Sequence, residues 1–92
     1  MVKEVRVSHI LVGSEEKANM ILNKIKTGYS FEKLAQEESK CPSRKRGGDL
    51  GWFTRGKMVR EFENFSFTLR KGDIGIVKSP FGYHIIKKVD EK

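Results

Sequence analysis

The chain has 92 residues, a net charge of +7 and one cysteine, which indicates a small domain held by its own core rather than by disulfides. Its hydrophobic and charged fractions, 37% and 34%, exclude a disordered chain, and no apolar run approaches the roughly 20 residues that span a bilayer. The opening residues lack the apolar core of a signal peptide, so we expect a cytoplasmic protein.

The first part of the chain predicts a strand followed by two helices. Apolar and polar residues alternate from residue 2 to residue 12, which predicts a half-buried strand. Its apolar face holds Val5, Val7, His9 and Leu11. A helix is predicted from Ser14, a good N-cap, to Gly28, and a second helix from Ser30 to about residue 38.

The second half predicts a glycine-rich loop, a third helix and two strands. The loop runs over residues 41–51 and leads into a short extended segment at 52–53. Large apolar residues at intervals of three and four predict a helix within 58–69. The last two strands lie at 76–78 and 83–89, and the second is apolar enough to be the centre of a sheet. This order predicts an α+β fold, with helices over a mostly antiparallel sheet.

Two kinds of side chain invite a chemical interpretation. His9 and His84 are the only histidines, and a histidine in a strand is more often a hydrogen-bonded core residue than a catalytic one. On paired strands, however, the two could face each other and fix each other's tautomer. Cys41 precedes a basic run at 44–46 that could make its thiol more reactive. A cysteine hydrolase is the weaker interpretation, because the sequence carries no oxyanion-hole signature.

An apolar set around the glycine-rich loop could form the wall of a pocket. Its members are Leu50, Phe53, Met58 and Phe62. Methionine and phenylalanine suit an adaptable pocket for an apolar ring, although the same residues could simply fill the core. Cys41 has only two histidines to join it, and the P-loop, dinucleotide and metalloprotease motifs are missing from the sequence, so we expect no metal or cofactor.

Four motifs, in order, give the chain a resemblance to a known family. They are H-I-L-V at 9–12, G-D-L-G-W-F-T-R-G-K-M-V at 48–59, F-E at 62–63 and F-G-Y-H-I-I-K at 81–87. With these separations they resemble the parvulin peptidyl-prolyl isomerases over nearly the whole chain. The resemblance implies one parvulin-like domain over residues 1–92, with a four-stranded, mostly antiparallel sheet surrounded by three to four helices.

The resemblance also implies an activity and a set of site residues. The activity is cis–trans isomerisation of X-Pro bonds in peptides and unfolded proteins, which assists folding, by a non-covalent mechanism in a dry proline pocket. The catalytic residues that it implies are His9, Cys41, Ser79 and His84. The substrate-binding residues that it implies are Leu50, Phe53, Met58, Phe62 and Phe81.

Phosphate-directed parvulins are a poorer match. Their first loop is long and rich in Arg and Lys, whereas residues 13–16 are short and acidic. We instead expect a rim formed by Arg44, Lys45 and Arg46 to favour acidic residues before the substrate proline. We expect a monomer whose partners are proline-containing peptides or unfolded proteins rather than membranes.

A non-catalytic basic binding module is the alternative function. The net charge of +7 could serve to bind nucleic acid or an acidic protein partner. This alternative predicts salt-dependent affinity for nucleic acid and no acceleration of prolyl isomerisation. The four ordered motifs favour the isomerase.

Overall fold

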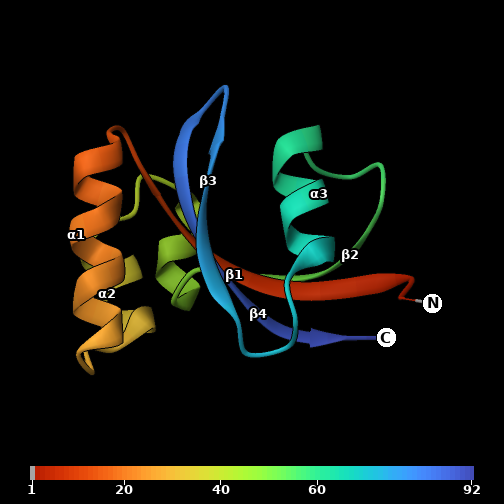
Figure 1. The fold of residues 1–92 in the computed structure, drawn as a ribbon, viewed down its shortest axis with the longest axis horizontal. Coiled ribbons are helices and arrows are strands. Elements are labelled where there is room, and N and C mark those ends of the chain that lie inside the picture. The colour runs from red at the N-terminus through yellow and green to blue at the C-terminus, as the bar shows by residue number, and fades with distance from the viewer. Residues whose placement is uncertain (1) are drawn as a thin grey trace.

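A four-stranded antiparallel sheet forms the centre of the molecule. The computed structural model describes residues 2–92. Its strands are β1 (Glu4–Val12), β2 (Asp49–Thr54), β3 (Ile74–Ser79) and β4 (Gly82–Glu91), in the spatial order β2-β1-β4-β3 (Figure 1). The two longest strands, β1 and β4, lie in the middle and pair with each other, and all three pairings are antiparallel. The predicted α+β class and four-stranded sheet are therefore confirmed.

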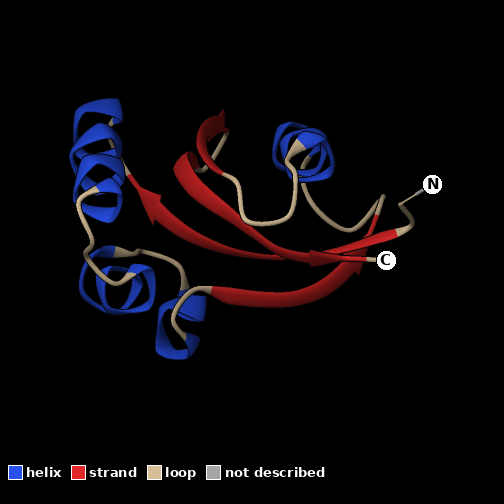
Figure 2. Ribbon diagram, turned by 60° about the horizontal axis from the view of Figure 1, so that its bottom comes forward, coloured by secondary structure: helices blue, strands red, loops and turns tan. Residues whose placement is uncertain are grey.

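Helices cover both faces of this sheet. They are α1 (Glu15–Lys26), α2 (Phe31–Glu38), the short 3-10 helix η1 (Pro42–Arg46) and α3 (Arg60–Thr68). Figure 1 shows α1 and α2 on one side of the strands and α3 on the other, and Figure 2 shows how strongly the sheet between them curves. Both predicted N-caps are present, since the hydroxyls of Ser14 and Ser30 accept backbone N–H bonds from the first turns. None of the helices in the described residues is long and apolar enough to cross a membrane.

Two apolar clusters, one on each face, hold these layers together. Ile85 and Ile86 are neighbours on β4 and therefore point to opposite faces. Ile85 belongs to the cluster beneath α1 and α2, with Ile10, Val12, Ala18, Ile21, Phe31, Leu34 and Ala35. Ile86 belongs to the cluster beneath α3, with Val5, Val7, Phe53 and Phe62. Burial on both faces explains why β4 reads as the most apolar strand.

The expectation of a half-buried first strand is wrong for its second half. The predicted apolar face is present, because Val5 and His9 lie on the side of α3. The opposite face is not polar, since Ile10 and Val12 are fully buried beneath α1 and α2. A central strand that helices cover on both faces does not show the alternation of apolar and polar residues that is typical of a strand with one solvent-exposed face.

The glycine-rich segment is more ordered than the predicted loop. Residues 42–46 form η1, Gly47 ends it in the left-handed region at φ 68°, and Gly48 follows at φ 90°. The amide of His9 donates to the carbonyl oxygen of Gly48 at 2.9 Å, and a Cβ on Gly48 would lie 2.5 Å from the carbonyl oxygen of His9. The missing side chain thus lets β2 start directly against β1, beside His9.

We predict that Gly48→Ala lowers the free energy of unfolding by about 2–4 kcal/mol, because the new Cβ must push β1 away while the residue holds a positive φ. Gly56→Ala is the matched control. Gly56 has a φ of 92° and no atom within 4 Å of a Cβ placed there, so we expect a loss of only about 1 kcal/mol. Urea unfolding measures both, and equal losses would show that the contact with β1 is unimportant.

Candidate functional site

A cavity of about 460 Å³ lies on the α3 side of the sheet, and we call it the histidine cavity. Most of its wall is apolar and consists of Leu11, Pro42, Leu50, Met58, Val59, Phe62 and Phe81. Its remaining lining residues are His9, Lys40, Cys41, Lys57 and His84. The cavity thus combines an apolar wall, large enough for a small ring, with two imidazoles and a thiol.

The structure places seven of the sequence-predicted site residues in this cavity. They are His9, Cys41, Leu50, Met58, Phe62, Phe81 and His84. Sequence reasoning misses Leu11, Lys40, Pro42, Lys57 and Val59, which also line it. Most of these flank a predicted residue directly, so proximity in the chain to Cys41 and Met58 is the signal that could have identified them.

The two histidines form a buried pair in the wall of the cavity. Their Nδ1 atoms are 3.0 Å apart, and the side chains of His9 and His84 are only 5% and 4% exposed. The Nε2 atom of His84 lies 2.6 Å from the Oγ atom of Ser79, which also accepts the amide N–H of Phe81. The predicted juxtaposition of the histidines across paired strands is confirmed, and Ser79 extends it to the end of β3.

Hydrogen-bond counting assigns the tautomers of this pair. The hydroxyl of Ser79 accepts from Phe81, and among the described residues Nε2 of His84 is its one potential acceptor, so we assign the hydroxyl proton to the bond with that nitrogen. His84 then carries its proton on Nδ1 and donates it to Nδ1 of His9. His9 is left with its proton on Nε2, a buried atom without a hydrogen-bond partner among residues 2–92. Because His9 lines the cavity, this atom is a hydrogen-bonding group that a bound molecule could satisfy.

Burial keeps both imidazoles uncharged. The pKa of His9 is lowered to about 4, first by burial and then by the neighbouring His84. Burial also lowers the pKa of His84. The pair therefore forms a polar but neutral part of the wall at pH 7.

Phe62 joins the histidine pair to the apolar wall. Its ring meets the rings of His9 and His84 edge-on, with centroids 5.4 Å and 5.0 Å away. Phe53 lies 6.2 Å from Phe62 on the core side and is only 6% exposed. The prediction that Phe53 lines the pocket is therefore wrong. It pairs with Val5 in the body of the sheet and supports Phe62 from behind.

Ser79 also lies outside the lining of the cavity. It is 6% exposed and bonds to two lining residues, to the ring of His84 and to the backbone amide of Phe81. The role that this geometry assigns to it is that of a positioning residue, which fixes the ring of His84, rather than a group that touches substrate.

Cys41 is held beside β1 by a residue that sequence reasoning misses. It is a half-buried free thiol, and its amide donates to the hydroxyl of Ser39 at 3.3 Å. The same hydroxyl accepts the amide of Leu11 at 3.0 Å. The hydroxyl of the buried Ser39 thus links Cys41, at the start of η1, to Leu11 on β1. Within residues 2–92, no group of three or more potential ligands could hold a metal ion.

The expected basic rim lies elsewhere. Arg44, Lys45 and Arg46 are exposed in the last turn of η1, and none of them lines the histidine cavity. A 3-10 helix rises by about 2 Å per residue, so η1 carries this run roughly 6–10 Å beyond Cys41. Lys40 and Lys57 are the basic residues that line the cavity, and Arg46 instead lines a second one.

Known proteins share both the sequence and the fold. Residues 1–92 match the family model of the PPIC-type PPIase domain. Foldase protein PrsA 1 of Bacillus cereus is 48% identical over 91 residues, which are 97% of this chain and 32% of that protein. The crystal structure of the peptidylprolyl isomerase PrsA from Bacillus anthracis superposes with a TM-score of 0.96 at 47% identity, covering 99% of this chain and 43% of that one.

A smaller relative matches from end to end. The solution structure of NmPin, the parvulin of Nitrosopumilus maritimus, superposes with a TM-score of 0.86 at 44% identity, covering 96% of this chain and 97% of that one. The chain thus spans nearly all of NmPin but about a third of the curated foldase that it matches.

We predict that the protein loses stability as the pH falls from about 6.5 to about 4. In this range an unfolded chain takes up a proton on His9, whose ordinary pKa is 6.5, whereas the folded protein keeps it neutral down to a pKa of about 4. The unfolded state binds more protons, so the free energy of unfolding falls by up to about 3 kcal/mol. Urea unfolding at several pH values measures this.

Asp49 and Asp90 act mainly at lower pH. The hydrogen bond from Arg6 lowers the pKa of Asp49 below 3.8, and a backbone hydrogen bond from Glu91 does the same for Asp90, so their effect lies at lower pH. In His9→Asn the slope between pH 6.5 and 4 should shrink. A wild-type stability that is constant over this range would contradict the buried neutral pair.

Proposed function

The chain belongs to the PPIC-type PPIase domain family and is a peptidyl-prolyl isomerase domain, and from this premise we propose that it rotates X-Pro bonds non-covalently in the histidine cavity. The observation that carries the proposal is the shared cavity of Leu50, Met58, Phe62, His9, His84 and Cys41. Because the curated relatives are named foldases, we propose unfolded polypeptides as the clients.

Catalysis of prolyl isomerisation requires only a modest stabilisation of the transition state. An X-Pro amide rotates against a barrier of about 18–20 kcal/mol and takes tens to hundreds of seconds unaided. Lowering the barrier by about 4 kcal/mol accelerates it roughly a thousandfold. In the twisted state the amide loses its resonance, so the carbonyl oxygen carries less negative charge and the nitrogen becomes more basic. A site with few charges and little water favours that less polar state.

The lining residues provide such a site. Leu50, Met58 and Phe62 would hold the proline ring while the rest of the peptide turns. The neutral histidines hold the ring of Phe62 from its edges. An imidazolium in their place would stabilise the negative carbonyl oxygen of the planar amide and thereby raise the barrier. Phe81, 69% exposed at the cavity, would offer a surface to the residue next to proline.

The geometry favours a polar rather than a nucleophilic role for Cys41. A nucleophilic thiol needs a base within hydrogen-bonding reach. Three of the four ring nitrogens of His9 and His84 bond to each other or to Ser79. The fourth, Nε2 of His9, has no hydrogen-bond partner within the described part of the chain. No imidazole is therefore in place to take the thiol proton.

We predict that the wild-type protein accelerates isomerisation of a short Ala-Xaa-Pro-Phe peptide and that Cys41→Asp keeps kcat/KM within about tenfold, because a polar group remains beside the substrate carbonyl. Met58→Ala should lose at least about tenfold, since it opens the wall that holds the ring. A protease-coupled assay or NMR exchange measures all three.

The results of these assays distinguish a polar from a nucleophilic Cys41, and an isomerase from a binding module. Inactive Cys41→Asp and Cys41→Ser variants that still fold would make the thiol obligatory. A folded wild-type protein with no effect on the peptide would remove the isomerase and leave the basic binding module.

We also propose that Lys40 and Lys57 favour an acidic residue before proline. Both are exposed, and among the described residues the cavity lining holds these two lysines and no carboxylate. We predict that kcat/KM for a Glu-Pro peptide exceeds that for a Lys-Pro peptide by about two- to fivefold at low salt, because exposed charges attract only modestly. High salt and the double variant Lys40→Gln/Lys57→Gln should reduce the ratio towards one. Equal rates for the two peptides at low salt would rule the preference out.

A further inference from the structure

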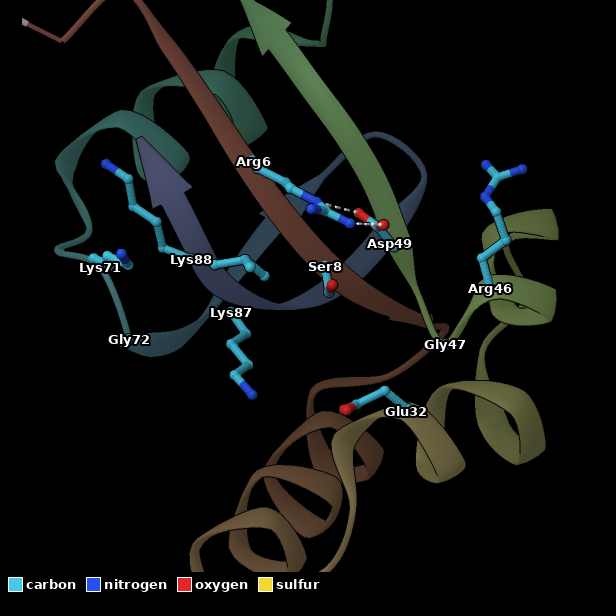
Figure 3. Close-up of a pocket in the computed structure, with 11 residues that line it drawn as sticks. Arg6, Ser8, Glu32, Arg46, Gly47, Asp49, Lys71, Gly72, Lys87 and Lys88 are labelled. Atoms are coloured by element: carbon cyan, nitrogen blue, oxygen red, sulfur yellow. Dashed lines mark hydrogen bonds and ion pairs between the residues drawn. The ribbon is translucent and has the colours of Figure 1, made fainter. Parts of the chain in front are cut away.

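A second cavity, of about 420 Å³, lies on the opposite face of β1 and β2 (Figure 3). Ser8 and Asp49 line it, whereas the next residues along the strands, His9 and Leu50, line the histidine cavity. Consecutive strand residues point to opposite faces, so the two cavities lie back to back across the sheet. We call this second one the basic cavity, and the proposed mechanism makes no use of it.

Cationic residues outnumber acidic ones in its lining. They are Arg6, Arg46, Lys71, Lys87 and Lys88, against Glu32 and Asp49, although the side chain of Lys88 is buried on the α3 face, where its Nζ atom donates to the carbonyl oxygen of Leu69. Three of the cations are engaged within the fold, since Arg6 pairs with Asp49 at 2.6 Å, Lys71 with Asp90 at 3.4 Å and Lys88 with Glu91 at 2.7 Å. These pairs shape the walls and leave little of their charge for a ligand.

The other two cations are available. Within residues 2–92 neither Arg46 nor Lys87 forms an ion pair, and they come from η1 and β4 on different sides of the hollow. Figure 3 shows Ser8 on β1 between the Arg6–Asp49 pair and Lys87. The side chains of Arg46 and Lys87 lie far apart and point in different directions (Figure 3), so an acidic segment that spans the hollow, rather than a single carboxylate, could meet both.

The composition of the walls decides which anion fits. Among the described residues Glu32 forms no ion pair, and its carboxylate in the lining would repel the continuous charge of a nucleic-acid backbone, whereas that of Asp49 is paired with Arg6. A peptide tolerates these carboxylates, because its acidic side chains can meet Arg46 and Lys87 while its own N–H groups donate to Glu32. A volume of about 420 Å³ accommodates two or three residues and lies within the usual range of ligand sites.

We propose that the basic cavity is a second peptide site, which binds an acidic stretch of the client polypeptide whose prolyl bond enters the histidine cavity. The proposal rests on the proposed function. β2 is an edge strand, so a client can pass around it from one cavity to the other. About ten extended residues reach up to ~33–36 Å, which matches the longest extent of the molecule, 33 Å. Two contacts on one client raise the effective concentration of its proline.

The direct test measures binding of a proline-free, Glu- and Asp-rich hexapeptide to the full chain by NMR titration at low salt. The amides of Ser8, Gly47 and Lys87 should shift more than those of the histidine cavity. The double variant Arg46→Gln/Lys87→Gln should weaken the affinity about tenfold. The matched control is Lys26→Gln/Lys33→Gln, which removes the same net charge from exposed positions on α1 and α2 and should change the affinity less than about twofold.

Two results would overturn the inference. One is equal weakening in both double variants, which would mean that only net charge attracts the peptide. The other is a single-stranded oligonucleotide that binds the basic cavity more tightly than the hexapeptide does. Because the hexapeptide lacks proline, its binding is independent of catalysis, and isomerisation of a short neutral peptide reports separately on the proposed function.

Discussion

The hydrogen bond between Nδ1 of His9 and Nδ1 of His84 joins the two central strands in the wall of the histidine cavity. On one side it continues through His84 to Ser79 at the end of β3, and on the other it supports the ring of Phe62 on α3. Four side chains thus connect three strands and a helix. Their geometry depends on both rings remaining uncharged, because an imidazolium at this burial would be strongly destabilised.

The two faces of the sheet carry cavities of different composition. On the α3 side, the neutral pair and its aromatic neighbours form an apolar wall, which suits the proposed twisting of a prolyl amide, and Lys40 and Lys57 contribute the charged residues of the lining. On the other side, Arg6 and Lys71 are held in ion pairs around the basic cavity, which the sheet separates from the histidine cavity. The segment from Lys40 to Leu50 borders both cavities, and Gly48 allows it to pass directly beside His9.

Much of this arrangement follows from the sequence, because local rules determine it. Residue periodicity and the caps Ser14 and Ser30 locate the strands and helices, and the spaced motifs identify His9, Met58 and Phe62 as parts of one site. The wrong predictions concern residues whose positions depend on tertiary structure rather than on local sequence. Leu50 and Phe53 are equally apolar residues of β2, and the register of β2 against β1 decides that Leu50 lines the cavity while Phe53 enters the core.

The basic residues show the same limit. Lys40 directly precedes Cys41 and Arg46 follows it at the end of η1, and the two residues line different cavities. No local pattern predicts that outcome. The role of Ser39 is equally unpredictable from the sequence. Its hydroxyl links two segments only because the fold brings the amides of Leu11 and Cys41 to it.

The most direct test of this account is the protonation state of the two imidazoles, measured by their ¹⁵N chemical shifts in the folded protein at pH 7. The account predicts two neutral rings of opposite tautomer, with His84 protonated on Nδ1 and His9 on Nε2, and a coupling across the hydrogen bond between the Nδ1 atoms. An imidazolium at either position, or two rings both protonated on Nε2, would contradict it.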